Sequence, residues 1–381
     1  MSVTFPRGFR AAGVTAGLKA SGKADVAVVV NDGPQWEAAG VFTRNRIQAA
    51  PVLWSRQVLA DGRLRAVVLN SGGANACTGP EGFADTHHTA EAAAAALDIG
   101  PIDVAVCSTG LIGERLDMAK LLAGLQHALS VADATGGPSA AEAIMTTDSV
   151  PKTSTFEAGY RIGGMAKGAG MLAPGMATML SVITTDAVID AAMLDEVFRA
   201  AVARTFDRVD ADGCMSTNDT VIVMASGASG VPADEAFAAG LRAVCADLSR
   251  QLAADAEGAS KLIDVTVVGA ASESDAESAA RAVARSALFK CAMFGEDPNW
   301  GRVLSAVGTT DAAFDPLRID VGINGVQVCR DSGPGEPRDL VDLSAREIEV
   351  VIDLHAGAAT ATIVTTDLTT DYVHENSAYS T

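Results

Sequence analysis

The chain contains few aromatic residues and few histidines. Phe, Trp and Tyr make up 4% of its 381 residues, although 49% of the residues are hydrophobic, and only five residues are histidine. The core must therefore be built mainly from aliphatic side chains, which suits closely packed layers of helices and sheets. No histidine is flanked by further ligands at the spacing of a zinc site, so we expect no protein-bound metal.

Basic residues and long hydrophobic runs are also scarce. The chain has 28 basic and 47 acidic residues, a net charge of -19, and no Lys/Arg run that could follow a phosphate backbone. Nucleic acid is therefore not an expected partner. The hydrophobic runs are far shorter than the roughly 20 residues of a membrane-spanning helix, and the first residues lack the apolar core of a secretory signal. The six cysteines form no C-x-x-C pair, and we interpret them as buried, reduced thiols. We predict a cytoplasmic protein without a membrane partner.

Short β-branched segments alternate with Ala-rich segments of helical periodicity, and this pattern predicts a layered α/β or α+β fold. The expected strands are residues 25–30, 65–70, 103–108, 179–185, 220–226, 262–268, 317–323, 347–354 and 360–366. The expected helices are residues 83–98, 189–206, 236–256 and 275–288. Because no long helix separates the last three strands, we expect them to pair antiparallel in a smaller β-rich unit.

The segment GMAKGAGMLAPGMATML, residues 164–180, is rich in glycine and methionine and leads directly into an apolar strand. Its GAGMLA part, residues 168–173, fits a G-x-G-x-x-A dinucleotide-binding pattern. That interpretation fails because Pro174 and Gly175 fall where the helix of the motif must continue. A P-loop fails as well, because the lysine is not followed by Ser or Thr. A plain loop between two strands remains open.

A nucleophilic role for Thr178 is the third interpretation. The Thr178 hydroxyl can attack the carbonyl of Ala177, and water can then hydrolyse the resulting ester. The chain would be cut between these two residues. Thr178 would then carry a hydroxyl nucleophile and a free α-amine, whose pKa of about 7.7 to 8.0 suits a general base near neutral pH.

This segment closely resembles the self-cleaving threonine segment of the ornithine acetyltransferases, the bifunctional enzymes of the arginine pathway that also act as glutamate N-acetyltransferases. The resemblance extends over nearly the whole chain. The matching blocks are NSGGANACTG (70–79), STGLIG (108–113), IMTTD (144–148), STNDT (216–220), EGASK (257–261), GEDPNWGR (295–302) and DYVHENSAYST (371–381).

The resemblance implies a reaction and a set of catalytic residues. Members of the family move the acetyl group of N-acetylornithine to glutamate in two half-reactions through the threonine, which is Thr178 here. The positions matching the family's oxyanion stabilisers are Thr109, through its hydroxyl, and Gly110, through its backbone N–H. Lys167 matches the substrate-contacting lysine, although by itself it could be an exposed loop residue.

The remaining substrate contacts are also carried over from the resemblance. In MTTD the family uses one threonine, and both Thr146 and Thr147 fit, with Thr146 preferred. Glu257 matches a glutamate that would hold the side-chain ammonium of ornithine. Asn376 and the terminal Thr381 complete the set, which requires the end of the chain to fold inward. The DPNWGR block matches well but has no assigned chemistry.

The resemblance further implies an αββα-type layered sandwich with a smaller β-rich C-terminal lobe around residues 310–381. Cleavage would give an α chain of residues 1–177 and a β chain of residues 178–381 that share one core. Two such pairs would form a heterotetramer of two α and two β chains.

No cofactor is expected, and the sequence leaves open whether acetyl-CoA is a second acetyl donor. Two alternatives compete with the acetyltransferase hypothesis. One is an N-terminal-nucleophile aminopeptidase of related fold, which would release acyl groups to water. The other is a non-catalytic amino-acid-binding protein, which would stay uncut.

Overall fold

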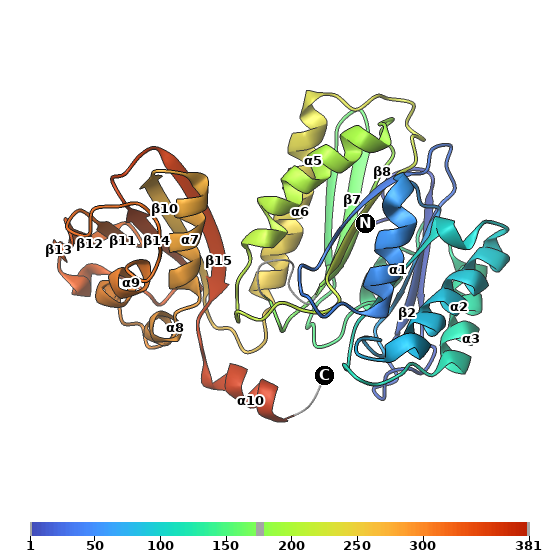
Figure 1. The fold of residues 1–381 in the computed structure, drawn as a ribbon, viewed down its shortest axis with the longest axis horizontal. Coiled ribbons are helices and arrows are strands. Elements are labelled where there is room, and N and C mark those ends of the chain that lie inside the picture. Colours follow the sequence, from blue (N-terminus) through green and yellow to red (C-terminus); the bar gives the residue numbers. More distant parts are fainter. Residues whose placement is uncertain (1, 173–178, 379–381) are drawn as a thin grey trace. The chain divides into compact units, whose positions relative to one another are not determined.

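The computed structural model describes residues 2–172 and 179–378, and it divides into two compact units (Figure 1). The first unit comprises Met1–Asp207 and Cys214–Asp255. The second comprises Arg208–Gly213 and Ala256–Ser380. The predicted lobe begins around residue 310, whereas the continuous part of the second unit begins earlier in the chain, at Ala256.

The first unit contains a four-stranded sheet of order β1-β2-β4-β5. Its strands are β1 (Phe9–Val14), β2 (Val26–Asn31), β4 (Ala66–Asn70) and β5 (Val104–Ser108). The pairs β1–β2 and β2–β4 are antiparallel, whereas β4–β5 is parallel. Around this sheet pack α1 (Ala50–Val58), α2 (Gly79–Leu97), α3 (Met118–Val131) and α4 (Gly137–Ala143). All residues of β2, β4 and β5 are buried, as expected for strands covered on both faces.

A five-stranded sheet of order β3-β9-β8-β7-β6 forms the other half of this unit. Its strands are β3 (Glu37–Phe42), β6 (Lys152–Glu157), β7 (Arg161–Lys167), β8 (Leu180–Thr185) and β9 (Thr220–Ala225). Only the β8–β9 pair is parallel. The helices α5 (Ala191–Ala203) and α6 (Glu235–Ala254) lie against this sheet (Figure 1).

Side-chain alternation in β7, β8 and β9 produces the layering of the first unit. Val182 and Ile222 belong to the same buried cluster as the four-stranded sheet. Their neighbours Ile183 and Val223 point the other way and pack with α5 and α6. The first unit is therefore a helix–sheet–sheet–helix sandwich, and the predicted mixed α/β layered fold is confirmed.

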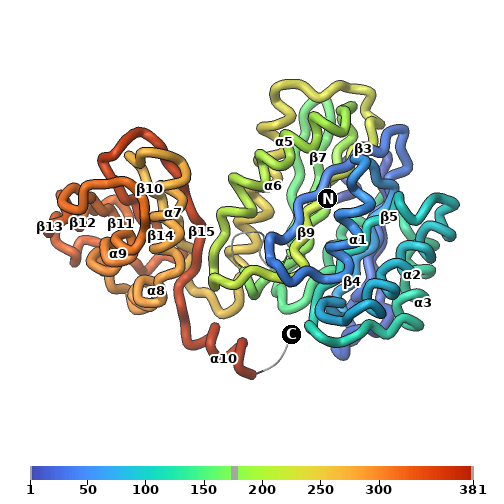
Figure 2. Tube along the Cα trace, in the orientation of Figure 1, coloured from blue at the N-terminus to red at the C-terminus, as the bar shows by residue number. Residues whose placement is uncertain are grey.

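The second unit is built on a six-stranded sheet of order β13-β12-β11-β14-β10-β15. Its strands are β10 (Leu262–Ala270), β11 (Asp320–Ile323), β12 (Val326–Arg330), β13 (Gly333–Pro334), β14 (Glu347–Asp353) and β15 (Ala359–Thr366). Its helices are α7 (Glu273–Ala284), α8 (Ala287–Phe294), α9 (Trp300–Val307) and α10 (Thr370–Ala378). Of these, α7 packs on β10 and β15 (Figure 2).

Three sequence expectations need correction here. The strands β11 and β14 pair antiparallel as predicted, but β14 and β15 do not pair, because β10 inserts between them and runs parallel to β14. The helix expected over residues 275–288 is two helices, because Ser286 caps the start of α8 by accepting the N–H of Phe289. Not all six cysteines are buried, since Cys77, Cys214 and Cys291 are exposed.

Within the described ranges, no helix combines the length and the apolar run needed to cross a bilayer.

Candidate active site

Thr109 and Gly110 directly follow β5, where they meet the NSGGANACTG block. Thr109 is buried, with 2% of its surface exposed, and its N–H donates to the Asn70 carbonyl at 3.0 Å. Its carbonyl accepts the Gly73 N–H at 3.0 Å. Gly110 has a φ of +130°, and a Cβ there would lie 2.8 Å from the Gly73 nitrogen. Only glycine fits such a close approach, so two blocks separated in the sequence form one tight corner.

Lys167 ends β7 and is brought to this corner. Its side chain is buried, with 1% of the residue exposed, and its Nζ donates to Thr109 Oγ1 at 3.2 Å. The interpretation of Lys167 as an exposed loop lysine is therefore wrong. A residue expected to contact the substrate and a residue expected to stabilise the oxyanion are hydrogen-bonded to each other.

Asp148 is the carboxylate that accompanies this lysine. Its Oδ2 accepts the Thr146 N–H at 2.9 Å, and its Oδ1 accepts the Gly168 N–H and the Lys152 Nζ, both at 2.6 Å. Burial alone would raise the pKa of Asp148, but the charges of Lys167 and Lys152 and the Gly168 N–H together lower it. Asp148 is therefore ionised at neutral pH and holds the backbone of a predicted substrate threonine.

Asp219 lies next to the start of β8. Its Oδ1 accepts the Met179 N–H at 3.1 Å, and the Met179 carbonyl accepts the Thr220 N–H at 3.1 Å. Burial raises the pKa of Asp219 well above its usual value. Among the described residues, its Oδ2 has no hydrogen-bond partner. Met179 directly follows Thr178 in the sequence, so the chain is fixed one residue after the predicted nucleophile.

The predicted nucleophile and two other predicted site positions lie outside the described residues. These are Thr178, its neighbour Ala177 at the predicted cleavage bond, and the terminal Thr381.

Asn218 connects the STNDT block to the corner around Thr109. Its Nδ2 donates to the Ala74 carbonyl at 2.6 Å and to the Ser108 carbonyl at 2.7 Å. These bonds tie the loop before β9 to the end of β5 and to the NSGGANACTG block. Asn218, Asp219 and Asp148 lie inside blocks that match the family. The match could have marked these positions, but the sequence alone assigned them no role.

Lys19 is a further residue that sequence reasoning missed, and no quoted block contains it. Its Nζ donates to the Met145 carbonyl at 2.6 Å and to the Ala24 carbonyl at 2.7 Å. Burial lowers the pKa of Lys19 to about 8, although Asp25 opposes the shift. Lys19 thus holds the residue just before Thr146.

Glu257 and Asn376 belong to the second unit. The EGASK block that contains Glu257 packs on the start of α10, because a Cβ on Gly258 would lie 2.2 Å from the Tyr372 nitrogen. Thr369 Oγ1 donates to the Gly258 carbonyl at 2.6 Å and accepts the Tyr372 N–H at 2.9 Å. Two blocks expected to contact substrate are therefore adjacent within this unit.

Asn376 lies on the exposed part of α10, and its Nδ2 donates to the Tyr372 carbonyl at 3.0 Å. Val373, on the same helix, is 58% exposed.

The DPNWGR block has a local structural role in the second unit. Asn299 caps α9 by accepting the Arg302 N–H, and Arg302 Nη1 donates to the Leu288 carbonyl at 2.6 Å. The block therefore starts one helix and ties it to the preceding one.

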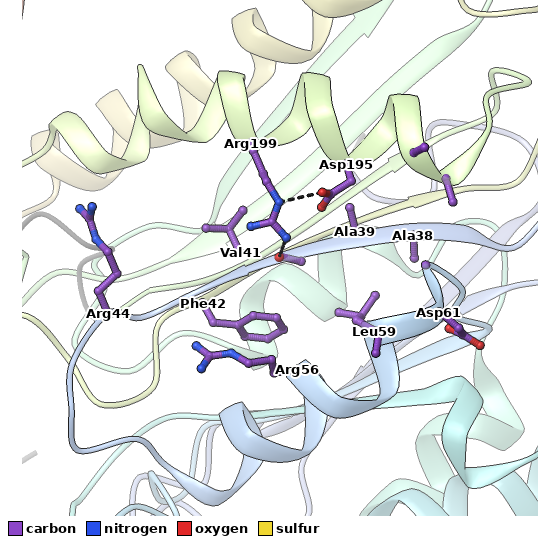
Figure 3. A pocket seen from close by; sticks show the side chains of 15 residues that line it. Ala38, Ala39, Val41, Phe42, Arg44, Arg56, Leu59, Asp61, Asp195 and Arg199 are labelled. Carbon is purple, nitrogen blue, oxygen red and sulfur yellow. Dashed lines mark hydrogen bonds and ion pairs between the residues drawn. The ribbon is translucent and has the colours of Figure 1, made fainter. Parts of the chain in front are cut away.

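Metal ligands and cavities were searched over the described residues. No group of three or more His, Cys, Asp or Glu side chains there could hold a metal ion. A cavity of about 710 Å³ lies beside the edge strand β3, between α1 and α5 (Figure 3). Its Arg199 is paired with Asp195 at 2.8 Å and also donates to the Gly40 carbonyl. None of the predicted site residues lines it, so we do not assign it to the reaction.

A family model of the ArgJ family matches residues 10–381. The chain belongs to the ArgJ family. The arginine biosynthesis bifunctional protein ArgJ of Thermobifida fusca (strain YX) is 63% identical over 383 residues, which cover 100% of both chains. The protein of that name from Mycobacterium leprae (strain TN) is 58% identical over 391 residues, which cover 99% of this chain and 95% of the relative.

One similar solved structure is that of ornithine acetyltransferase complexed with ornithine, from Mycobacterium tuberculosis. It is 62% identical, covers 47% of this chain and 96% of its own, and has a TM-score of 0.45. The family resemblance seen in the sequence is confirmed, and this ArgJ-family chain is an acetyltransferase of arginine biosynthesis.

Proposed function

We propose that this ArgJ-family enzyme transfers the acetyl group of N-acetylornithine to glutamate through an acetyl ester on Thr178. The contact between Lys167 and Thr109 carries the proposal. It joins two residues, distant in the sequence, that both match site residues of the family. Family membership over residues 10–381 supports the same reaction.

The self-cleavage step prepares the nucleophile. The Thr178 hydroxyl oxygen attacks the Ala177 carbonyl carbon, the C–N bond breaks, and the amide nitrogen takes up a proton to become the α-amine of Thr178. Water then hydrolyses the ester, which leaves a carboxylate on Ala177 and restores the hydroxyl. The free α-amine can then accept the proton of that hydroxyl during transfer, because its pKa lies near neutral pH.

The transfer itself takes two half-reactions. The Thr178 oxygen attacks the acetyl carbonyl, the amide bond breaks, and ornithine leaves with the proton on its amine. The amine of glutamate then attacks the acetyl ester, N-acetylglutamate forms, and the Thr178 hydroxyl regains its proton. Each half-reaction passes through a tetrahedral oxyanion, which must be stabilised by fixed donors.

Thr109 and Gly110 are suited to stabilise that oxyanion. An ammonium group has only donors, so Thr109 Oγ1 must accept the hydrogen bond from Lys167. The hydroxyl hydrogen of Thr109 is then available for another acceptor, and the adjacent positive charge polarises it further. We assign the Thr109 hydroxyl and the Gly110 N–H to the oxyanion.

Substrate recognition is assigned to Thr146, Lys167, Glu257, Asn376 and Thr381. Lys167 is proposed to pair with a substrate carboxylate, and Glu257 with the side-chain ammonium of ornithine. Acetyl-CoA is proposed as a second, slower acetyl donor, and no resident cofactor is required.

The cut chains, residues 1–177 and 178–381, are proposed to stay together and to assemble as a heterotetramer in the cytoplasm.

Initial-rate kinetics test the covalent route. Parallel double-reciprocal lines for N-acetylornithine and glutamate are expected, because the first product leaves before the second substrate reacts. Intersecting lines would exclude the acetyl-threonine intermediate. Thr178→Ala should abolish both cleavage and transfer, and a variant that still transferred acetyl groups would refute the mechanism.

A further inference from the structure

Asp148, Lys152 and Asp255 form a chain of ion pairs in the first unit. Lys152 is fully buried, and its Nζ lies 2.6 Å from Asp148 Oδ1 and 2.6 Å from Asp255 Oδ2. Charges in a protein interior are costly unless they are paired and hydrogen-bonded, and apolar side chains often replace such pairs without loss of stability. Stability alone therefore does not explain why these three side chains are charged.

The carboxylate of Asp148 joins two segments that carry proposed substrate contacts. One oxygen accepts the Thr146 N–H at 2.9 Å, and the other accepts the Gly168 N–H at 2.6 Å. Gly168 is the residue after Lys167. An ionised carboxylate accepts one bond on each oxygen, whereas an amide of the same size replaces one of these oxygens by an NH2 group, which donates and does not accept.

The carboxylate of Asp255 lies at the other end of the chain of ion pairs. It accepts the N–H of Ser149 at 3.0 Å and the Ser149 hydroxyl. Asp255 is also the last residue that the first unit contributes before Ala256. Asp255 therefore holds both Lys152 and the backbone of Ser149, the residue after Asp148.

We propose that Asp148, Lys152 and Asp255 are positioning residues that hold the Thr146 and Lys167 segments in place for substrate binding. This ion-pair chain acts through the backbone and contacts no reacting atom. The inference rests on the proposed function, because the substrate roles of the two segments belong to that proposal.

The proposal predicts that both ends of the ion-pair chain affect the binding of both substrates, with the larger effect at Asp148. Asp148→Asn should weaken the binding of each substrate about tenfold, which equals about 1.4 kcal/mol, because the Thr146 and Lys167 segments serve both. Asp255→Asn should weaken the binding of both substrates by a smaller factor, about threefold, because it acts on these segments only through Lys152 and Ser149.

Asp186 offers a matched control in the same unit. It is buried, and its carboxylate accepts the Arg161 N–H at 2.6 Å and the Arg7 N–H at 3.0 Å. Asp186→Asn removes the same kind of bond from two backbone segments without a predicted substrate contact. A comparable loss of thermal stability with unchanged KM values is expected for this variant.

Two separate readouts distinguish this inference from the proposed function. Acetyl transfer by the wild-type enzyme tests the proposed function, and its absence would refute that function. Calorimetric titration of ornithine and glutamate into wild type, Asp148→Asn, Asp255→Asn and Asp186→Asn tests the positioning role without turnover.

The pattern described above, with KM changes that follow the calorimetric affinities, would support the ion-pair chain as a positioning device. Asp255→Asn keeps the test informative if Asp148→Asn does not fold, because its side chain is partly exposed. Equal affinities of the folded variants and wild type would overturn the inference. Equal weakening by Asp186→Asn would overturn it too, because the losses would then reflect stability alone.

Discussion

Asp148 and Asp219 are both buried in the first unit, and they hold the two ends of residues 168–179. Asp148 accepts the N–H of Gly168, and Asp219 accepts the N–H of Met179. The pKa of Asp148 is lowered, whereas the pKa of Asp219 is raised well above its usual value. The segment that contains the proposed cleavage bond therefore runs from a carboxyl group with a lowered pKa to one with a raised pKa.

The neighbours of each aspartate explain this difference. Burial opposes ionisation of both side chains. Asp148 has the ammonium groups of Lys152 and Lys167 beside it, and these outweigh burial. Asp219 accepts hydrogen bonds, and the charge of Lys167 also favours its ionised form, but these effects do not outweigh burial. Residue type and burial alone thus do not determine the charge of an aspartate; the number of nearby cations decides it.

The largest predicted effect concerns Thr109. Its hydroxyl accepts a hydrogen bond from Lys167, whose charge also lowers the pKa of both aspartates. Thr109→Val keeps the side-chain size and removes the hydroxyl. We expect kcat to fall by about 10²-fold or more, as for loss of one oxyanion donor, with KM nearly unchanged. Steady-state kinetics on the cut enzyme measure both values. A kcat close to that of wild type would show that the Lys167–Thr109 contact serves only the fold.

Asp148→Asn should produce the next largest effect. It leaves buried ammonium groups without their carboxylate, and we expect about 3 kcal/mol less unfolding free energy at pH 7. Urea unfolding in a Thr178→Ala background, which should keep the chain whole, measures it. Because the pKa of Asp148 is lowered in the folded state, this difference should shrink as the pH falls through that pKa. A loss that does not depend on pH would contradict the assigned charge.

Asp219→Asn should have the smallest effect and the opposite pH dependence. Burial raises the pKa of Asp219 in the folded protein, whereas the unfolded chain releases this proton above a pKa of about 3.9. Wild-type stability should therefore fall, relative to Asp219→Asn, as the pH rises from there towards the folded-state pKa. At pH 7 the variant should be at least as stable as wild type. Urea unfolding of both proteins from about pH 5 to pH 7 measures the difference. A variant that became less stable than wild type with rising pH would show that Asp219 is ionised.

Some of this arrangement could be predicted from the sequence. Periodicity predicted most strands and the layered fold, because β-branched runs and Ala-rich segments differ clearly. The matched blocks identified Thr109 and Lys167 as site residues, and the structure places them in contact. Their separation of 58 residues gave no sign of that contact, because it depends on how β5 and β7 are placed in two different sheets.

Other features depend on long-range packing and could not be predicted. The insertion of β10 between β14 and β15 is one, because neighbouring strands in the sequence were expected to pair. The opposite pKa shifts of Asp148 and Asp219 are another, since both occur in short polar blocks and only their three-dimensional neighbours differ. Lys19 reaches the Met145 carbonyl from 126 residues away and lies in no recognisable block.

The intact mass of the purified protein under denaturing conditions tests the central claim most directly. The account predicts two chains with the masses of residues 1–177 and 178–381, with Thr178 as a free N-terminus. A single uncut chain that nevertheless transfers acetyl groups from N-acetylornithine to glutamate would contradict it, because the α-amine of Thr178 could not then act as the general base.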